Sequence, residues 1–351
     1  MSAASRAIPD ERPDLAIVIV SARDAHWLER CLTTIAEHTG GANTEVIVVD
    51  NASTDGTREY VESNFPDVRV VVVEPPNRGF AVGNNRGLQA ADARYVLMLN
   101  PDTEIVEGTF AELIAMLDDR PEIGVLGVRQ VKADGSLCKS IHRFPSVSRA
   151  LGEALSSERW PVRPSWSGER ELDPAAYARE GDCDWPTGAF LLLRREALLS
   201  AGLLDERFYL LCEEPDLCLR IRQAGWRIVY TPSMTVVHHA GKGGVRPRMI
   251  AQEAYSRKQY ADKHFRGLYR RAYIGALALR YAIRAAAIGR ADDRKARREG
   301  SRLAIATLAG RTGAPHVEPP ATAIRPLGEQ TVPRAEQDAL DAVPPRAARA
   351  G

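Results

Sequence analysis

Asp102 is an acidic residue that follows an apolar run and could bind a cation. Residues 95–99 read Tyr-Val-Leu-Met-Leu, a pattern typical of a buried strand in a parallel sheet. Pro101 ends the strand because proline has no N–H to donate to the ladder. Asp102 is therefore expected at the carboxyl end of a central strand, where open α/β sheets bind ligands. With Asn100 and Thr103 it could hold a hard cation that carries a phosphorylated substrate; capping a helix is the alternative.

A second acidic group places three carboxylates within four residues, at Glu213, Glu214 and Asp216. The group follows residues 208–211, which are aromatic and apolar, so we expect it next to the core. Crowded carboxylates raise one another's pKa, which suits a general base. The alternative is a solvated start of a helix, with Asp216 as its N-cap.

Two further polar side chains end predicted strands. Asp50 follows residues 46–49 at the same sheet edge as Asp102, and could accept N–H donors from a base or a ribose. A turn residue is the alternative for Asp50. His238 closes the last predicted strand and could bind a metal or a phosphate, although His238 and His239 together more often have no such role.

Residues 77–87 form a glycine-rich entry into a predicted helix. Its glycines, Gly79, Gly83 and Gly87, match neither the dinucleotide pattern nor the P-loop. They could let backbone N–H groups approach a phosphate or a base, with Asn84 adding amide donors and acceptors. A purely structural turn is the alternative.

Strands that alternate with helices position these residues. Strands are predicted at residues 15–20, 46–49, 68–73, 95–99, 124–128 and 226–230. Helices are predicted from Asp24 as a cap to about residue 39, at 57–63, up to 91, at 107–117, from 195, and at 216–224. This alternation predicts right-handed βαβ units and hence an α/β fold with a parallel sheet.

Taken in order, these segments resemble one known family. The segments are residues 50–57, 77–88, 99–103, 185–190, 205–208 and 213–220. The ordered set looks like a family 2 inverting glycosyltransferase with the GT-A fold, a Rossmann-like α/β fold with a mostly parallel sheet. It is most similar to the bacterial rhamnosyltransferase-like branch. The resemblance covers about residues 14–245, roughly two-thirds of the chain.

The resemblance implies a role for each matching residue. A nucleotide-sugar donor is expected at Ser21, Asp50, Asn51, Asn77, Gly83, Asn84 and Asn100. A metal ion, Mg²⁺ or Mn²⁺, is expected at Asp102 and His238. The acceptor is expected at Trp185 and Gly188. The base is expected to be Glu214, with Glu213 or Asp216 as substitutes.

Three positions depart from the family pattern. Asn100 stands where the first carboxylate of the metal-binding D-x-D motif is expected. Glu214 stands where the base motif usually has aspartate, and the first loop reads Ser21-Ala-Arg instead of an Asn-Tyr-Asn type.

The implied activity is transfer of a sugar with inversion. The base takes a proton from an acceptor hydroxyl, whose oxygen displaces a nucleoside diphosphate without a general acid. The expected sugar is L-rhamnose from dTDP-rhamnose, and the expected acceptor is a cell-envelope polysaccharide or its polyprenyl-diphosphate-linked precursor. Two alternatives are a nucleotidyltransferase and a catalytically weak or inactive nucleotide-sugar-binding scaffold of the same fold.

Charge is distributed unevenly along the chain. Residues 242–300 hold sixteen Lys and Arg against five Asp and Glu, although the net charge of the chain is only +1. Residues 273–288 within this part are largely apolar. We therefore predict a basic helical extension at 246–310 that contacts an anionic membrane surface. Packing against the main domain is the alternative, and nucleic-acid binding is disfavoured because no known motif is present.

The remaining features indicate location. Residues 1–13 are polar, which predicts a flexible N-terminus without a signal peptide, and 311–351 are Pro- and Ala-rich, which predicts a disordered tail. The five cysteines are scattered, and no run of about 18 apolar residues occurs. The expected location is the cytoplasm, peripheral on the inner face of the plasma membrane.

Overall fold

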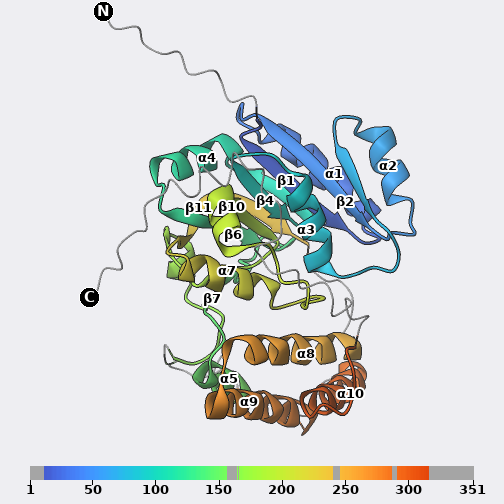
Figure 1. Cartoon of the computed structure of the whole chain (residues 1–351), viewed down its shortest axis with the longest axis vertical. Coiled ribbons are helices and arrows are strands. Elements are labelled where there is room, and N and C mark those ends of the chain that lie inside the picture. The colour runs from blue at the N-terminus through green and yellow to red at the C-terminus, as the bar shows by residue number, and fades with distance from the viewer. Residues whose placement is uncertain (1–11, 156–163, 165, 240–245, 287–290, 316–351) are drawn as a thin grey trace, which may run out of the picture.

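The computed structural model describes residues 12–155, 164, 166–239, 246–286 and 291–315. Its centre is a nine-stranded sheet of order β3-β2-β1-β4-β10-β6-β11-β5, in which β8 also pairs with β11 (Figure 1). The strands are β1 (Leu15–Ser21), β2 (Thr44–Asn51), β3 (Arg69–Val73), β4 (Tyr95–Leu99), β5 (Thr103–Glu107), β6 (Ile123–Val131), β8 (Gly181–Asp182), β10 (Phe190–Arg194) and β11 (Arg227–His238). The helices beside the sheet are α1 (Ala25–Glu37), α2 (Thr57–Asn64), α3 (Phe80–Ala90), α4 (Phe110–Asp119), α6 (Arg195–Ala201) and α7 (Glu213–Gln223). A small separate sheet pairs β7 (Ile141–His142) with β9 (Trp185–Pro186).

Strand β1 shows why helices cover both faces of the sheet. Its odd-numbered residues from 15 to 19 belong to a buried cluster with apolar side chains of α1 and α4. Its even-numbered residues from 16 to 20 belong to a second cluster with apolar side chains of α3, α6 and α7. Successive side chains of a strand point to opposite faces, so an unbroken apolar run requires cover on both. The predicted α/β class is confirmed.

The strand pairing brings the predicted polar residues to one edge. Strands β1, β2, β3 and β4 are all parallel, and Ser21 is in register with Asp50. Beyond β4 the order changes, because β10 runs antiparallel to β4 and β6, and β5 runs antiparallel to β11. The antiparallel pairing of β5 places Thr103 opposite His238, so the ends of β4 and β11 meet beside Asp102.

Two local predictions need correction. The helix expected at 107–117 begins only at Phe110, because the Thr109 side chain accepts from the N–H of Glu112 and Glu112 accepts from that of Thr109 in a capping box. Asp24 precedes α1 but makes no side-chain cap hydrogen bond. Its Oδ2 accepts from the N–H of Ala22 at 3.2 Å, and Asp55 accepts from the first N–H of α1.

A helical unit lies beyond α7 on one side of the sheet domain (Figure 1). It contains α8 (Pro247–His264), α9 (Gly267–Ala286), α10 (Ala291–Leu308) and also α5 (Val147–Ala154). The four helices share a small core that includes Ala150, Tyr273 and Ala304. Helix α5 lies within residues 14–245 by sequence, yet Ala150 packs into this core, so the extension is built from two parts of the chain.

Buried ion pairs join the parts of the helical unit. Arg257 of α8 pairs with Glu169, which precedes β8, at 2.5 Å, and Arg280 of α9 pairs with Glu153 of α5 at 2.9 Å. No helix among the described residues is both long and apolar enough to cross a membrane. The predictions of a flexible N-terminus and a disordered tail fall mostly on residues 1–11 and 316–351, which lie outside the described residues.

Candidate active site

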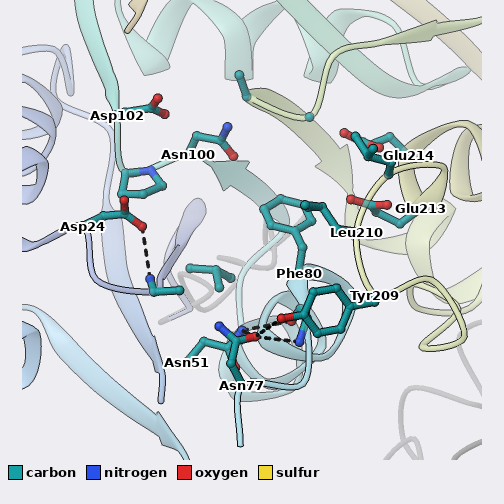
Figure 2. A pocket seen from close by; sticks show the side chains of 17 residues that line it. Asp24, Asn51, Asn77, Phe80, Asn100, Asp102, Tyr209, Leu210, Glu213 and Glu214 are labelled. Carbon is teal, nitrogen blue, oxygen red and sulfur yellow. Dashed lines mark hydrogen bonds between the residues drawn. The ribbon is translucent and has the colours of Figure 1, made fainter. Parts of the chain in front are cut away.

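A pocket of about 410 Å³ opens at the carboxyl ends of β1, β2 and β4. Seventeen residues line it: Val20, Ala22, Asp24, Asn51, Asn77, Gly79, Phe80, Asn100, Pro101, Asp102, Gly188, Ala189, Tyr209, Leu210, Leu211, Glu213 and Glu214. Figure 2 shows Glu213 and Glu214 on one side, Asp24 and Asp102 on the other, and Asn100 between them. The pocket therefore brings residues from six separate parts of the chain together.

One end of the pocket is an amide cluster. The Oδ1 of Asn77 accepts from the Nδ2 of Asn51 at 3.2 Å, from the N–H of Gly79 at 2.9 Å and from the hydroxyl of Tyr209 at 3.3 Å (Figure 2). The Oδ1 of Asn51 is buried and has no partner among the described residues. A buried acceptor of this kind is costly unless a ligand donates to it. This end is thus suited to a ligand that carries an N–H or O–H group.

Gly79 lets two loops meet at this end. The N–H of Phe80 donates to the carbonyl of Tyr209 at 2.7 Å, and Gly79 has a φ of +98°. A Cβ on Gly79 would lie 2.3 Å from the carbonyl oxygen of Tyr209. Only glycine combines this backbone conformation with so close an approach.

We expect Gly79→Ala to lower the free energy of unfolding by about 1–3 kcal/mol from backbone strain, and further because Tyr209 must move. Urea unfolding would measure the change. Gly41→Ala is the matched control, since Gly41 also has a positive φ, +87°, but its Cβ would meet nothing within 4 Å. Equal losses for the two variants would contradict a role for the close contact.

The opposite wall carries two carboxylates at the start of α7. Glu213 is almost fully buried, and its Oε2 has no partner among the described residues. Burial, and next the charge of Glu214, raise the pKa of Glu213 well above its ordinary value. Burial also raises the pKa of Glu214, against hydrogen bonds from the N–H groups of Glu214 itself and of Gly188. A Cβ on Gly188 would lie 2.5 Å from the Oε1 of Glu214, so Gly188 makes room for this carboxylate.

Asp216, the third acidic residue, is placed elsewhere. It lies inside α7 and not at its N-cap, and it is fully buried outside the pocket lining. Its carboxylate binds Arg220 at 2.9 Å and both Lys263 and His264 at 2.7 Å. Burial opposes ionisation, but these contacts lower the pKa of Asp216 to about 2. The prediction of Asp216 as a substitute base is therefore corrected, because its oxygens are already occupied by cations.

The side of the pocket that follows β4 could hold a cation, with His238 of β11 next to it but outside the pocket lining. The Oδ1 of Asp102 and the Nδ2 of Asn100 each lie 3.4 Å from the Nε2 of His238. Burial lowers the pKa of His238, but hydrogen bonds with Asp102 and Cys138 outweigh it and raise the pKa to about 9. The described residues contain no group of three or more His, Cys, Asp or Glu side chains able to hold a metal. Mg²⁺ commonly takes one or two carboxylates plus substrate phosphates, so Asp102 fits a cation shared with a diphosphate, and His238 would bind that cation only after giving up its proton.

Asp24 also lines this side and was missed as a site residue. Its carboxylate is free of helix capping and faces the pocket (Figure 2). Burial raises the pKa of Asp24, and the charge of Asp102 adds to the effect. The position of Asp24 before a helix predicted a cap, but its Oδ2 accepts from the N–H of Ala22 instead.

Several predicted contacts lie outside the pocket lining. Gly83 packs against β1, where a Cβ would lie 2.6 Å from Val20, and Asn84 donates its amide to the carbonyl of Phe80 within α3. The expectation that Gly83 and Asn84 line a nucleotide pocket is therefore corrected, because both serve the packing of α3.

Ser21, Asp50 and Trp185 also lie outside the lining. Ser21 is fully buried at the end of β1, and Asp50 accepts from the N–H of Ser53 at 2.8 Å. Trp185 stacks on His142 with ring centroids 4.2 Å apart and donates to the carbonyl of Arg143. These three residues support the loops around the pocket.

The comparisons with known proteins agree on one family. The family model "Glycosyl transferase family 2" matches residues 16–170. An N-acetylglucosaminyl-diphospho-decaprenol L-rhamnosyltransferase of Mycobacterium tuberculosis is 32% identical over 285 residues, which cover 76% of this chain and 91% of the relative.

Two solved structures are similar in fold. The mannosyltransferase PcManGT from Pyrobaculum calidifontis, in complex with GDP-Man and Mn²⁺, has a TM-score of 0.50 at 19% identity, covering 86% of this chain and 88% of that one. GalNAc-T7 with UDP, GalNAc and Mn²⁺ has a TM-score of 0.54 at 16% identity, covering 83% and 55%. At these identities the likeness concerns the fold alone.

Proposed function

The chain belongs to glycosyl transferase family 2, in its rhamnosyltransferase-like branch, and from this we propose that it transfers L-rhamnose from dTDP-rhamnose to a polyprenyl-diphosphate-linked N-acetylglucosaminyl acceptor. The chain is a glycosyltransferase with the GT-A fold. The observation that carries the proposal is a relative of matching length whose name states this sugar and this type of acceptor. The pocket supports it, because it sets a candidate base opposite a candidate diphosphate site.

The proposed reaction inverts the anomeric carbon. Glu214 accepts the proton of an acceptor hydroxyl, and the hydroxyl oxygen forms a bond to the anomeric carbon as the bond from that carbon to the diphosphate oxygen breaks. The electron pair leaves with the nucleoside diphosphate, so a general acid is not needed. Asn51, Asn77 and Tyr209 are proposed to hold the nucleoside. A divalent cation at Asp102 and His238 would neutralise negative charge on the leaving diphosphate.

The test is a panel of nucleotide sugars. Purified protein is given each donor with Mn²⁺, with and without a polyprenyl-diphosphate-linked N-acetylglucosamine, and the nucleoside diphosphate released and the glycosylated lipid are measured. We expect transfer with dTDP-rhamnose only when the acceptor is present. Turnover of another donor would revise the sugar, and neither release nor transfer with any donor would favour the nucleotide-sugar-binding scaffold.

We also propose that α9 contacts an anionic membrane surface that presents this acceptor. Seven apolar or small residues of α9 are exposed and recur at helical spacing, so they form one face: Leu268, Ala272, Gly275, Leu279, Ala282, Ile283 and Ala286. Arg271 is exposed at the edge of this face. An apolar face bordered by positive charge is typical of a helix that lies in the interface of an anionic leaflet.

We expect the double variant Leu279→Gln with Ile283→Gln to bind vesicles at least about tenfold more weakly, because burial of each apolar side chain contributes on the order of 1 kcal/mol or more. Co-sedimentation with phosphatidylcholine vesicles that contain about 30% phosphatidylglycerol would measure it. The matched control replaces Val72 and Val106 by glutamine, since these are 41% and 44% exposed and lie in the sheet domain, against 42% and 38% for Leu279 and Ile283. Equal binding of both double variants would refute this contact.

A further inference from the structure

Residues 208–212 form the wall of the pocket between the amide cluster and the carboxylates of α7. On its other side this wall contacts the helical unit. The carbonyl of Tyr209 accepts from Phe80 at 2.7 Å on the pocket side. The next carbonyl, that of Leu210, accepts from the hydroxyl of Ser256 in α8 at 2.7 Å. Gln252, one turn earlier in α8, donates to the same carbonyl at 3.5 Å and to Ser256 at 3.0 Å.

This wall needs such support because its backbone is strained. Leu211 and Cys212 have φ values of +70° and +72°, in the left-handed region that residues other than glycine rarely adopt. Each costs on the order of 1–3 kcal/mol unless the surroundings fix it. Cys212 is the N-cap residue of α7 and makes no side-chain cap hydrogen bond. The left-handed conformation at the start of α7, which directs Glu213 and Glu214 into the pocket, is therefore not stabilised by a cap bond from the Cys212 side chain.

The C-terminal end of α8 holds the first turn of α7. Lys263 binds Asp216 and Asp205, each at 2.7 Å, and so joins the segments before and after the wall. His264 binds the same oxygen of Asp216 at 2.7 Å and packs against Tyr260. Since Asp216 lies one turn inside α7, these bonds fix the helix that carries Glu214. Helix α8 thus contacts the wall at Leu210 and the base-bearing helix at Asp216.

We propose that α8 is a positioning element for the catalytic base, in which Ser256 and Lys263 hold Glu214 where it can accept the proton of the acceptor hydroxyl. The proposal rests on the role of Glu214 given above. Neither residue lines the pocket, so both act through the backbone of Leu210 and the carboxylate of Asp216. The same unit that carries the exposed face of α9 therefore also sets the geometry of the base.

The test uses the full chain and two matched pairs of variants. Ser256→Ala removes the hydroxyl, Ser256→Thr keeps it, and Ser301→Ala replaces an equally buried serine in α10. Lys263→Met removes the second contact, and Lys258→Met removes a lysine of the same helix that pairs with Asp262. We expect Ser256→Ala and Lys263→Met to lower kcat between about ten- and a hundredfold, because a displacement near 1 Å can have that effect. The KM for the donor should stay within about twofold, and Ser256→Thr should recover most of kcat.

Amide hydrogen exchange of residues 209–216 gives a readout that does not require activity. We expect exchange there to rise about tenfold or more in Ser256→Ala and Lys263→Met and to stay unchanged in Ser301→Ala and Lys258→Met. An unchanged kcat together with unchanged exchange would overturn the proposal. Loss of kcat in the control variants to the same degree would also overturn it, since the effect would then be general destabilisation. An inactive wild-type protein would refute the proposed function, while exchange would still decide whether α8 holds the wall.

Discussion

Replacing Glu214 by glutamine is expected to lower kcat by about 10²- to 10⁴-fold, the range that a general base contributes. Glutamine keeps the size of the side chain and can still accept from the N–H of Gly188, but it cannot take the proton of an acceptor hydroxyl. Donor binding should change little, because the amide cluster at Asn51 and Asn77 is at another end of the pocket (Figure 2). Initial rates of transfer at saturating donor and acceptor, with the donor Kd measured by calorimetry, would separate the two effects.

Glu213→Gln is the control for this assignment. Glu213 is more deeply buried than Glu214, and burial together with its neighbour's charge favours its neutral form. A neutral carboxylic acid resembles an amide in charge, so we expect Glu213→Gln to reduce kcat much less. If Glu213→Gln abolished transfer and Glu214→Gln did not, the base would be Glu213.

The pH profile follows from the same carboxylate. Burial raises the pKa of Glu214 above its ordinary value, so the group stays protonated to a higher pH than a free glutamate. A base must be deprotonated to act, so kcat should fall as the pH drops through this raised pKa. The acidic limb is thus expected above pH 4.5, the ordinary value for glutamate. A limb at or below the ordinary value would be inconsistent with Glu214 as the base.

The strands of the first half were predictable from sequence because each is an unbroken apolar run between turn residues. Strand β5 was not, since its five residues mix polar and apolar types and pair with β11, more than 120 residues away in the chain. The antiparallel direction of β10 could not be predicted from its own sequence either. Its sequence, Phe-Leu-Leu-Leu-Arg, is that of any buried strand, and its direction is set by the connection that precedes it.

Some pocket residues could also be predicted from the sequence, and others could not. Asp102 and Glu214 could be found because carboxylates follow buried segments, and Asn77 because an amide precedes a glycine-rich helix start. Tyr209 and Leu210 were missed because the wall they form depends on left-handed backbone at the two residues that follow, for which no glycine gives a signal. Asn84 was predicted to contact the nucleotide, but its amide bonds to the carbonyl of Phe80 in its own helix. Helical periodicity alone does not tell which of these two roles an amide has.

Replacing Asp102 by asparagine should have the second large effect. We expect kcat/KM to fall about 10²-fold or more, because Asp102 is the carboxylate that lies 3.4 Å from His238 at the proposed cation site, and a bound cation supplies several kcal/mol of charge stabilisation. Calorimetry of Mn²⁺ binding in the presence of dTDP gives a measurement that does not depend on turnover. Glu104→Gln is the matched control, since Glu104 follows closely in β5 but pairs with Arg30 and His239 outside the pocket.

Asn100 makes this prediction more specific. The family pattern places a carboxylate where this chain has Asn100, and the Nδ2 of Asn100 lies 3.4 Å from the Nε2 of His238. A second carboxylate there adds a hard oxygen ligand, so Asn100→Asp is expected to tighten Mn²⁺ binding while Asp102→Asn weakens it. Opposite effects of the two substitutions would place the cation between β4 and β11. If Mn²⁺ binding were unchanged in both variants, Asp102 would act on the substrate directly, and removal of divalent cations by a chelator should then leave transfer intact.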